Sequence, residues 1–282
     1  MGPAVVRGIM SGQVMDDELI LRKRVAFFYG CFVNYYYPEL GEATLEVLAK
    51  NGVEVAVPDQ VCCGLPMVGK GNVKEASQNM EFNTRQVGRL VIEGYALIST
   101  CPSCGLFIKE YYPRMLGGKE AQQVSQSVYH ITEYLMSLHR MGQLATDFLT
   151  MNRTVFYHTP CHLRAQQNVR QVGNPTVELL RLIPGVTVTE VSEECCGMAG
   201  SYGYQKVNYE RSQGIAARLF MRIKETPTDR IVDDCGGCRL QIEAGTGRQV
   251  DHPIILLHEA YGLAKTRESL GASRDPGPMS SR

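Results

Sequence analysis

Short apolar runs alternate along the chain with longer segments in which apolar residues recur every three or four positions. The runs have the length and residue types of β-strands, and the periodic segments are typical of amphipathic helices. The six strand candidates are 25–29, 53–57, 96–99, 155–157, 186–191 and 230–232. Strands that alternate with helices predict an α/β fold with parallel sheets, because each helical crossover returns the chain in the same direction.

The helix candidates carry their apolar side chains on one face. These faces are formed by Ala43, Val47 and Leu48, by Val87, Leu90 and Val91, by Val177, Leu180 and Ile183, and by Ile215, Leu219 and Ile223. We therefore predict two duplicated βαβαβα halves, at 24–150 and 151–266, with a connecting stretch over 117–152 that holds some helix at 128–138. Residues 1–23 form an N-terminal tail. The polar residues 267–282 are expected to be disordered.

Ten cysteines are the unusual feature of this 282-residue chain, which is 44% hydrophobic. Its 29 basic and 29 acidic side chains argue against a nucleic-acid surface, which needs a clustered basic excess. No apolar run approaches the roughly 20 residues of a membrane-spanning helix, and no secretory signal is evident. We expect a cytoplasmic protein, where patterned cysteines serve as metal ligands or redox groups more often than as disulfides.

The cysteines form two sets that share one order: a single cysteine, then Cys-Cys-Gly, then Cys-x-x-Cys. The first set is Cys31, Cys62, Cys63, Cys101 and Cys104, and the second is Cys161, Cys195, Cys196, Cys235 and Cys238. Corresponding members lie 130 to 134 residues apart, so the chain contains an internal duplication. Because the carboxyl ends of parallel strands meet at one sheet edge, each set is expected to form one site.

Three kinds of chemistry suit clustered thiolates. A structural zinc site uses four ligands in a tetrahedron, whereas each half offers five cysteines, two of them adjacent. Dithiol redox chemistry suits a lone Cys-x-x-Cys at a helix start, such as the segment 101–104, but not its repetition with three further cysteines. Iron–sulfur clusters fit better, because thiolates are their usual ligands and a cluster offers several iron atoms.

The doubled cysteine pattern resembles the cysteine-rich domains in the catalytic subunit of heterodisulfide reductase, over roughly residues 24–262. Within that superfamily the local sequence is most similar to the iron–sulfur subunit of anaerobic glycerol-3-phosphate dehydrogenase, at 30–35, 157–162, 195–203 and 241–243. That subunit normally begins with a ferredoxin-like module, which is not expected here because all ten cysteines belong to the two sets. The resemblance implies that each five-cysteine set binds a noncubane [4Fe-4S] cluster.

Four further residues are candidates for supporting the clusters. Gly64 and Gly197 follow the cysteine pairs, where a glycine lets the backbone turn tightly and bring N–H groups to sulfur, although a plain turn is the alternative. His158 and His162 flank Cys161 and could donate hydrogen bonds to sulfide, although histidines near strand ends are as often structural. No catalytic residue is assigned.

Two functions are consistent with these features. In the first, the chain is the iron–sulfur subunit of a multi-subunit oxidoreductase and carries electrons from a flavoprotein dehydrogenase to a quinone or other acceptor. Its partners would be that flavoprotein, a ferredoxin-like iron–sulfur subunit, or a quinone-reactive subunit that holds it at the inner face of the membrane. In the second, the chain cleaves a disulfide between two noncubane clusters. A structural zinc protein is the third, non-enzymatic alternative.

Overall fold

The computed structural model describes residues 22–167 and 173–264. The expected disordered segment 267–282 and nearly all of the tail 1–23 lie outside the described residues. The first half contains β1 (Arg24–Phe28), α2 (Gly30–Tyr35), α3 (Pro38–Lys50), β2 (Glu54–Ala56), α4 (Leu65–Val68), α5 (Val73–Ile92), β3 (Ala96–Ser99), α6 (Pro102–Glu110), α7 (Tyr112–Leu116), α8 (Gly118–Gln126), β4 (Val128–His130) and α9 (Ile131–Arg140). The second half contains β5 (Arg153–His158), α10 (Cys161–Gln167), α12 (Pro175–Arg181), β6 (Val186–Val191), the 3₁₀ turn η1 (Lys206–Asn208), α13 (Tyr209–Glu225), β7 (Arg230–Val232), α14 (Gly236–Thr246), β8 (Val250–Asp251) and α15 (Pro253–Ala260).

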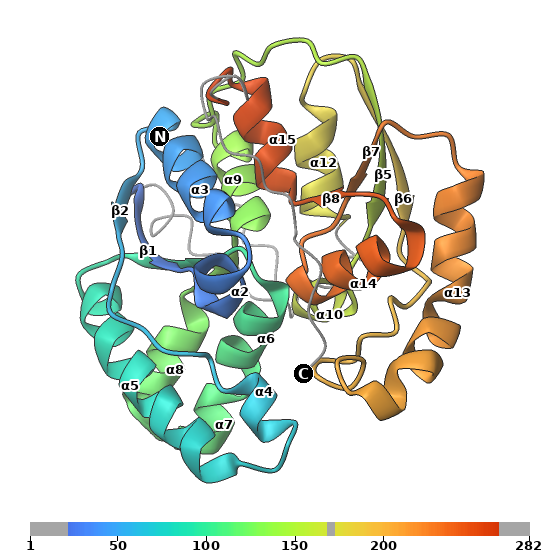
Figure 1. Ribbon diagram of the computed structural model, residues 1–282. Helices are drawn as coiled ribbons and strands as arrows, with labels where there is room; N and C mark the ends of the chain where they lie inside the picture. Colours follow the sequence, from blue (N-terminus) through green and yellow to red (C-terminus); the bar gives the residue numbers. More distant parts are fainter. Residues whose placement is uncertain (1–21, 168–172, 265–282) are drawn as a thin grey trace.

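Each half is built on a four-stranded sheet in which every strand pairing is parallel (Figure 1). The strand orders are β2-β1-β3-β4 and β6-β5-β7-β8, so the two sheets share one topology. The predicted α/β fold with duplicated parallel sheets is confirmed. In each sheet the second strand is added on one side of the first strand, and the third and fourth strands are added on its other side. Folds of this kind bind ligands at that point, outside the carboxyl ends of the strands.

A fourth strand in each sheet is absent from the sequence prediction. In the stretch expected to connect the halves, the helix expected at 128–138 is present as α9, and α8 and β4 precede it. The strand β4 completes the first sheet beside β3. The strand β8 does the same beside β7. These strands contain only three and two residues, and Val128 leads directly into an apolar helix. Their signal in the sequence is therefore masked by the helical pattern that follows.

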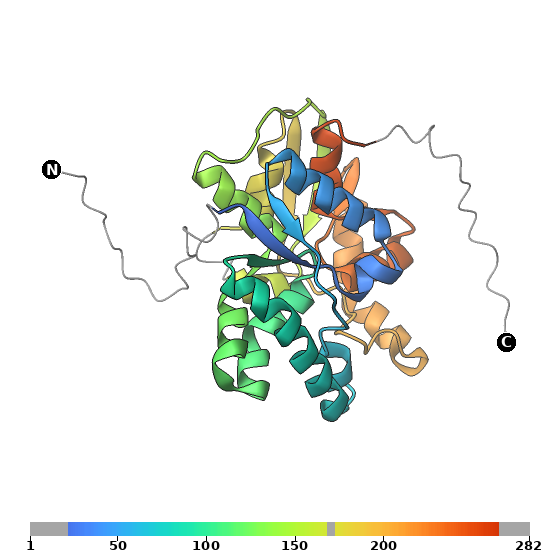
Figure 2. The ribbon, with the colours of Figure 1, turned by 90° about the vertical axis from the view of Figure 1, so that its left-hand side faces the viewer.

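A single hydrophobic core lies between the two sheets and contains residues from both halves. In β1, Val25 and Phe27 face this shared core, whereas Phe28 faces a core confined to the first half. In β5, Tyr157 faces the shared core and Phe156 a core of the second half. This alternation follows from the two-residue period of a strand. The helices α3, α9, α12 and α15 occupy the space between the sheets (Figure 1, Figure 2).

The buried face of α13 differs from the prediction at one position. Leu219 and Ile223 are buried as expected, but Ile215 is 49% exposed. Ser212 and Ala216 take its place against the core of the second half. Small residues are needed there because the backbone of the Cys-Cys-Gly loop lies against this part of the helix.

Across the described ranges, no helix is both long enough and apolar enough to cross a lipid bilayer.

Candidate metal centres

Each cysteine lies in the loop or helix that follows the carboxyl end of a strand. The first set consists of Cys31 in α2 after β1, Cys62 and Cys63 in the loop after β2, and Cys101 and Cys104 at the start of α6 after β3. The second set consists of Cys161 in α10 after β5, Cys195 and Cys196 in the loop after β6, and Cys235 and Cys238 at the start of α14 after β7. All ten thiols are free.

The thiols of the first set form one hydrogen-bonded group. The thiols of Cys31 and Cys63 both contact Cys62, and these hydrogen bonds lower the pKa of Cys62 to about 3. Cys104 contacts Cys63 and Cys101, and its hydrogen bond lowers the pKa of Cys101 to about 7. Residues as much as 73 positions apart in the sequence thus meet at one sheet edge. The same hydrogen bonds raise the pKa of Cys31 and Cys104, so the thiols of this group share protons.

The second set converges in the same way but is more open to solvent. The Cys238 thiol donates to Cys196 over a Sγ–Sγ distance of 3.0 Å. Hydrogen bonds from Cys195 and Cys238 lower the pKa of Cys196 to about 6. Desolvation and the neighbouring Cys235 and Cys195 raise the pKa of Cys161. Cys161 and Cys195 are the two exposed cysteines of the chain, so this site faces the surface.

The glycines that follow the cysteine pairs occupy equivalent positions. Gly64 and Gly197 have φ of +101° and +78°, a region in which side chains are strained. The Gly197 N–H donates to Cys195 Sγ at 3.3 Å, and the Gly64 N–H donates to Cys62. A Cβ on Gly197 would collide with the carbonyl oxygen of Ser212 in α13. The turn that directs the Gly197 N–H toward sulfur therefore also packs closely against α13.

Neutral side chains support the cysteine pair of the first site. The Asn83 amide accepts from Val61 N–H at 2.9 Å and donates to Cys62 O at 3.3 Å. The Tyr112 hydroxyl donates to Cys63 O at 3.0 Å and accepts from Asn83. Because Asn83 and Tyr112 are buried, these bonds hold the loop backbone in one conformation.

A buried histidine–aspartate pair supports the cysteine loops of the second site. His158 Nδ1 lies 2.5 Å from Asp233 Oδ2, and its Nε2 bonds Glu194 O at 3.1 Å, so both ring nitrogens are engaged away from sulfur. Burial lowers the pKa of His158, but the charge of Asp233 outweighs it and the net pKa is raised. The other oxygen of Asp233 accepts from Cys235 N–H at 2.6 Å. His158 thus ties two cysteine loops together.

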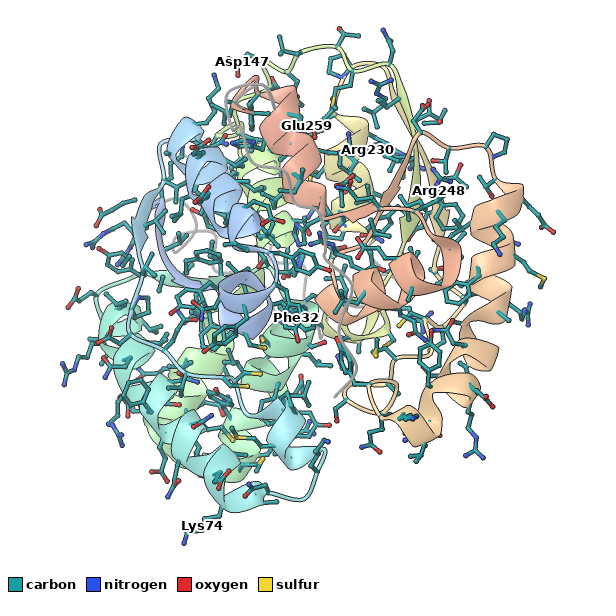
Figure 3. All side chains as sticks on the ribbon, in the orientation of Figure 1. Phe32, Lys74, Asp147, Arg230, Arg248 and Glu259 are labelled. Atoms are coloured by element: carbon teal, nitrogen blue, oxygen red, sulfur yellow. The ribbon has the colours of Figure 1, made fainter. Side chains whose placement is uncertain are left out.

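The two sites touch each other through residues that lie between their cysteines. Ser103, inside the first Cys-x-x-Cys, has its hydroxyl 2.7 Å from His162 Nδ1 and 3.9 Å from Cys235 Sγ. Phe32, beside Cys31, packs so closely on Gly236 that any Cβ there would collide with its ring. Figure 3 shows Phe32 where α2 meets the second half. His162 therefore contacts the Cys-x-x-Cys segment of the first site.

Sequence reasoning does not reveal several of these side chains. Asp233 and Asp234 precede Cys235 at the end of a strand, a position that could have marked them as support for the second site. Ser103 is part of a Cys-x-x-Cys motif, but only the packing of α10 against α6 shows what it touches. Asn83 and Tyr112 lie on helices remote in sequence from Cys62, and no local pattern distinguishes them from other polar helix residues.

Comparison with known families gives the same duplication. A model described as "Cysteine-rich domain" matches residues 25–109 and 155–243. The chain belongs to the cysteine-rich domain family. Each matched copy contains one complete five-cysteine set, so the family membership expected from the cysteine pattern is confirmed.

Three relatives illustrate the range of proteins that contain these domains. A subunit of the anaerobic glycerol-3-phosphate dehydrogenase of Escherichia coli is 35% identical over 249 residues, which cover 88% of this chain and 61% of the relative. A subunit of the fumarate reductase (CoM/CoB) of Methanothermobacter marburgensis is 33% identical, covering 78% and 42%. An uncharacterized iron-sulfur protein of Methanococcus maripaludis is 29% identical, covering 81% and 43%. The chain thus spans about two fifths to three fifths of these relatives.

Proposed function

We propose that this chain is the iron–sulfur subunit of a multi-subunit oxidoreductase, in which it carries electrons between a flavoprotein dehydrogenase and a quinone or other acceptor. The observation that supports this most is the contact between the two thiol sites through Ser103, His162 and Cys235. Redox centres on either side of this contact would be placed to exchange electrons within one chain. The relatives named as parts of a dehydrogenase and of a reductase are consistent with such a role.

The residues present suit iron–sulfur clusters. All ten cysteines are free, and hydrogen bonds join the thiols of the first set and those of Cys195, Cys196, Cys235 and Cys238 in the second. Thiols give up their protons when they bind a metal. Five soft thiolates exceed the four that a structural zinc ion takes. We propose that each five-cysteine set holds one [4Fe-4S] cluster of the noncubane type. When bound, these clusters supply one-electron carriers.

The chain's own residues would orient the ligands and control access to them. The Gly64 and Gly197 N–H groups donate to cysteine sulfur, and such bonds shift the potential of a cluster upward by stabilising added negative charge. Asn83, and His158 with Asp233, hold the cysteine loops. Because Cys161 and Cys195 are exposed, the second site is the better placed for exchange with a partner protein.

The proposed partners are a flavoprotein dehydrogenase and a ferredoxin-like iron–sulfur subunit. Where the acceptor is a membrane quinone, a quinone-reactive subunit would complete the chain of carriers. We propose a cytoplasmic location, at the inner face of the membrane through such a partner, because ten unpaired cysteines suit a reducing compartment.

Reduction by a partner tests the electron-transfer function. Anaerobically purified, cluster-loaded protein is mixed with the flavoprotein dehydrogenase that co-purifies with it, and the cluster absorbance is followed after the organic substrate is added. Bleaching that requires both substrate and flavoprotein is expected. The proposal would be contradicted if no flavoprotein co-purified with the chain and if no added flavoprotein dehydrogenase bleached the cluster absorbance.

A disulfide reductase is the second candidate. A disulfide could reach the second thiol site at the exposed Cys161 and Cys195. The Ser103–His162 pair lies beside this site. Oxidation of a reduced viologen dye by small disulfides would favour this function. Lack of turnover across a panel of disulfides would leave electron transfer as the activity.

A further inference from the structure

Two buried histidines occupy equivalent places in the two halves. His130 ends β4 and begins α9, and His252 follows β8 and begins α15. Both side chains are fully buried, and their ring centroids lie 6.3 Å apart across the boundary between the halves. Neither residue belongs to the cysteine motifs. Their common target is the carbonyl oxygen of Thr100, which lies 3.4 Å from His130 Nε2 and 3.0 Å from His252 Nε2.

A hydrogen bond at the other side of the His252 ring fixes which of its nitrogens carries the proton. His252 Nδ1 accepts from the backbone N–H of Ile254 at 3.2 Å, as a cap of α15. His130 Nδ1 instead lies 2.8 Å from the Thr132 hydroxyl, which lies 2.8 Å from the Thr176 hydroxyl, a donor to Asp234. The neutral His252 ring therefore carries its proton on Nε2 and donates it to Thr100. Burial lowers the pKa of both rings, to about 3 for His130, so both stay neutral.

Thr100 immediately precedes Cys101 of the first thiol site. The N–H of Cys101 donates to Ser99 Oγ at 3.1 Å, while the carbonyl of Thr100 accepts from His252 Nε2. The peptide group that joins Thr100 to Cys101 is thus held at both of its polar ends. The orientation of this peptide sets the direction in which the Cys101 side chain leaves the backbone.

A metal ion is the alternative occupant of this place. One ring nitrogen each of His130 and His252 and a carboxylate oxygen of Asp234 all lie within 4.8 Å of one another. However, a neutral imidazole that binds a metal through Nε2 must carry its proton on Nδ1, and His252 Nδ1 accepts the backbone N–H of Ile254. Asp234 is also engaged, since it accepts from the Tyr157 hydroxyl at 2.5 Å. The hydrogen bonds therefore favour an N–H donor at His252 over a metal site.

We propose that His252 is a positioning residue for the first thiol site, which it controls from the opposite half of the molecule by fixing the Thr100–Cys101 peptide. This inference rests on the proposed function in so far as Cys101 binds a cluster. The counterpart of Thr100 in the second half is Asp234, whose carboxylate lies in the same buried polar group. The two halves consequently meet at the backbone of one candidate ligand.

Three variants separate a positioning role from general destabilisation. His252→Phe removes the donor and keeps an aromatic ring, whereas His252→Gln supplies an amide N–H at a similar reach. Leu256→Ala, in the same helix, removes buried packing at a residue that makes no hydrogen bond to Thr100. Two measurements are made on the full chain: the electron paramagnetic resonance signals of the loaded protein, and amide hydrogen exchange in metal-free protein over 97–104 relative to 231–238.

The expected result for His252→Phe is a changed or lost signal from the first cluster with the second intact, and about tenfold faster exchange over 97–104 alone. His252→Gln is expected to restore both readouts, and Leu256→Ala to affect the two segments alike. The proposal is overturned if His252→Phe leaves segment 97–104 unchanged, or if zinc is bound in the wild type and lost in this variant. If the wild type holds no iron, the proposed function fails, and the exchange measurement still decides the role of His252.

Discussion

Gly197 shows how a single residue can shape a thiol site. Its φ of +78° turns the chain directly after Cys196 and aims its own N–H at Cys195. The same turn presses its Cα against Ser212 of α13, whose hydroxyl donates back to Gly197 O at 2.9 Å. The sequence predicts a glycine with this purpose at both cysteine pairs. Its contact with α13 could not be predicted, because it depends on how that helix packs.

Gly197→Ala is expected to destabilise the protein strongly. A Cβ there meets the strain of a left-handed backbone, about 1–2 kcal/mol, and also collides with the backbone of Ser212. Gly200→Ala is the matched control, because its φ of +64° carries the same strain but a Cβ there meets nothing within 4 Å. Urea unfolding should show a larger loss of unfolding free energy for Gly197→Ala. Equal losses would mean that the contact with α13 is unimportant.

At the scale of elements, the helices α13 and α14 each contain a glycine, and the two glycines differ in what surrounds them. Gly245 of α14 is packed against the ring of Phe220 on α13, so the two helices approach closely. Gly214 of α13 faces open space and has no such partner within 4 Å. Helical glycines are costly in conformational entropy, so one that makes a contact and one that does not should respond to alanine in opposite ways.

Alanine at Gly214 is expected to stabilise the protein by about 0.5–1 kcal/mol, because it favours the helix and disturbs nothing. At Gly245 the same change should destabilise it, since the new methyl group displaces Phe220. Thermal unfolding of the two variants beside the wild type checks both signs. A rise in Tm for Gly245→Ala would show that the helices separate without cost.

Most elements could be predicted from periodicity, and the exceptions have physical causes. The predicted strands 96–99, 186–191 and 230–232 agree with the structure to the residue, since each is a compact run of strand-forming residues between helices. The strands β4 and β8 escape prediction because they are short and run almost directly into α9 and α15, whose helical patterns dominate the local sequence. The prediction that Ile215 is buried is wrong, because the loop backbone at Gly197 leaves room only for Ala216 and Ser212.

At the scale of the whole molecule, the hydrophobic core between the two sheets joins the two halves. It contains Val25 and Leu48 from the first half and Val155 and Leu257 from the second. The duplication visible in the sequence indicates two separate thiol sites, and each set does converge within its own half. Sequence alone could not show that the halves share a core, or that Ser103 touches Cys235, because such contacts require the packed structure.

Truncation of the shared core should therefore loosen both sheets together. Leu257→Ala is expected to cost about 2–5 kcal/mol and to accelerate amide exchange in β1 and β5 alike. Ile242→Ala, in the core confined to the second half, should have a similar cost but act mainly on β5 and β7. Hydrogen exchange followed by mass spectrometry distinguishes the two patterns. An effect of Leu257→Ala restricted to the second half would show that the halves unfold independently.

Metal and sulfide analysis of anaerobically purified protein tests the central claim, that each five-cysteine set holds an iron–sulfur cluster, most directly. Two [4Fe-4S] clusters predict about eight iron atoms and about eight inorganic sulfides per chain. Cys196→Ser should reduce both numbers to about four while the signal of the first cluster remains. Zinc in place of iron, or loss of both cluster signals in Cys196→Ser, would contradict two independent cluster sites.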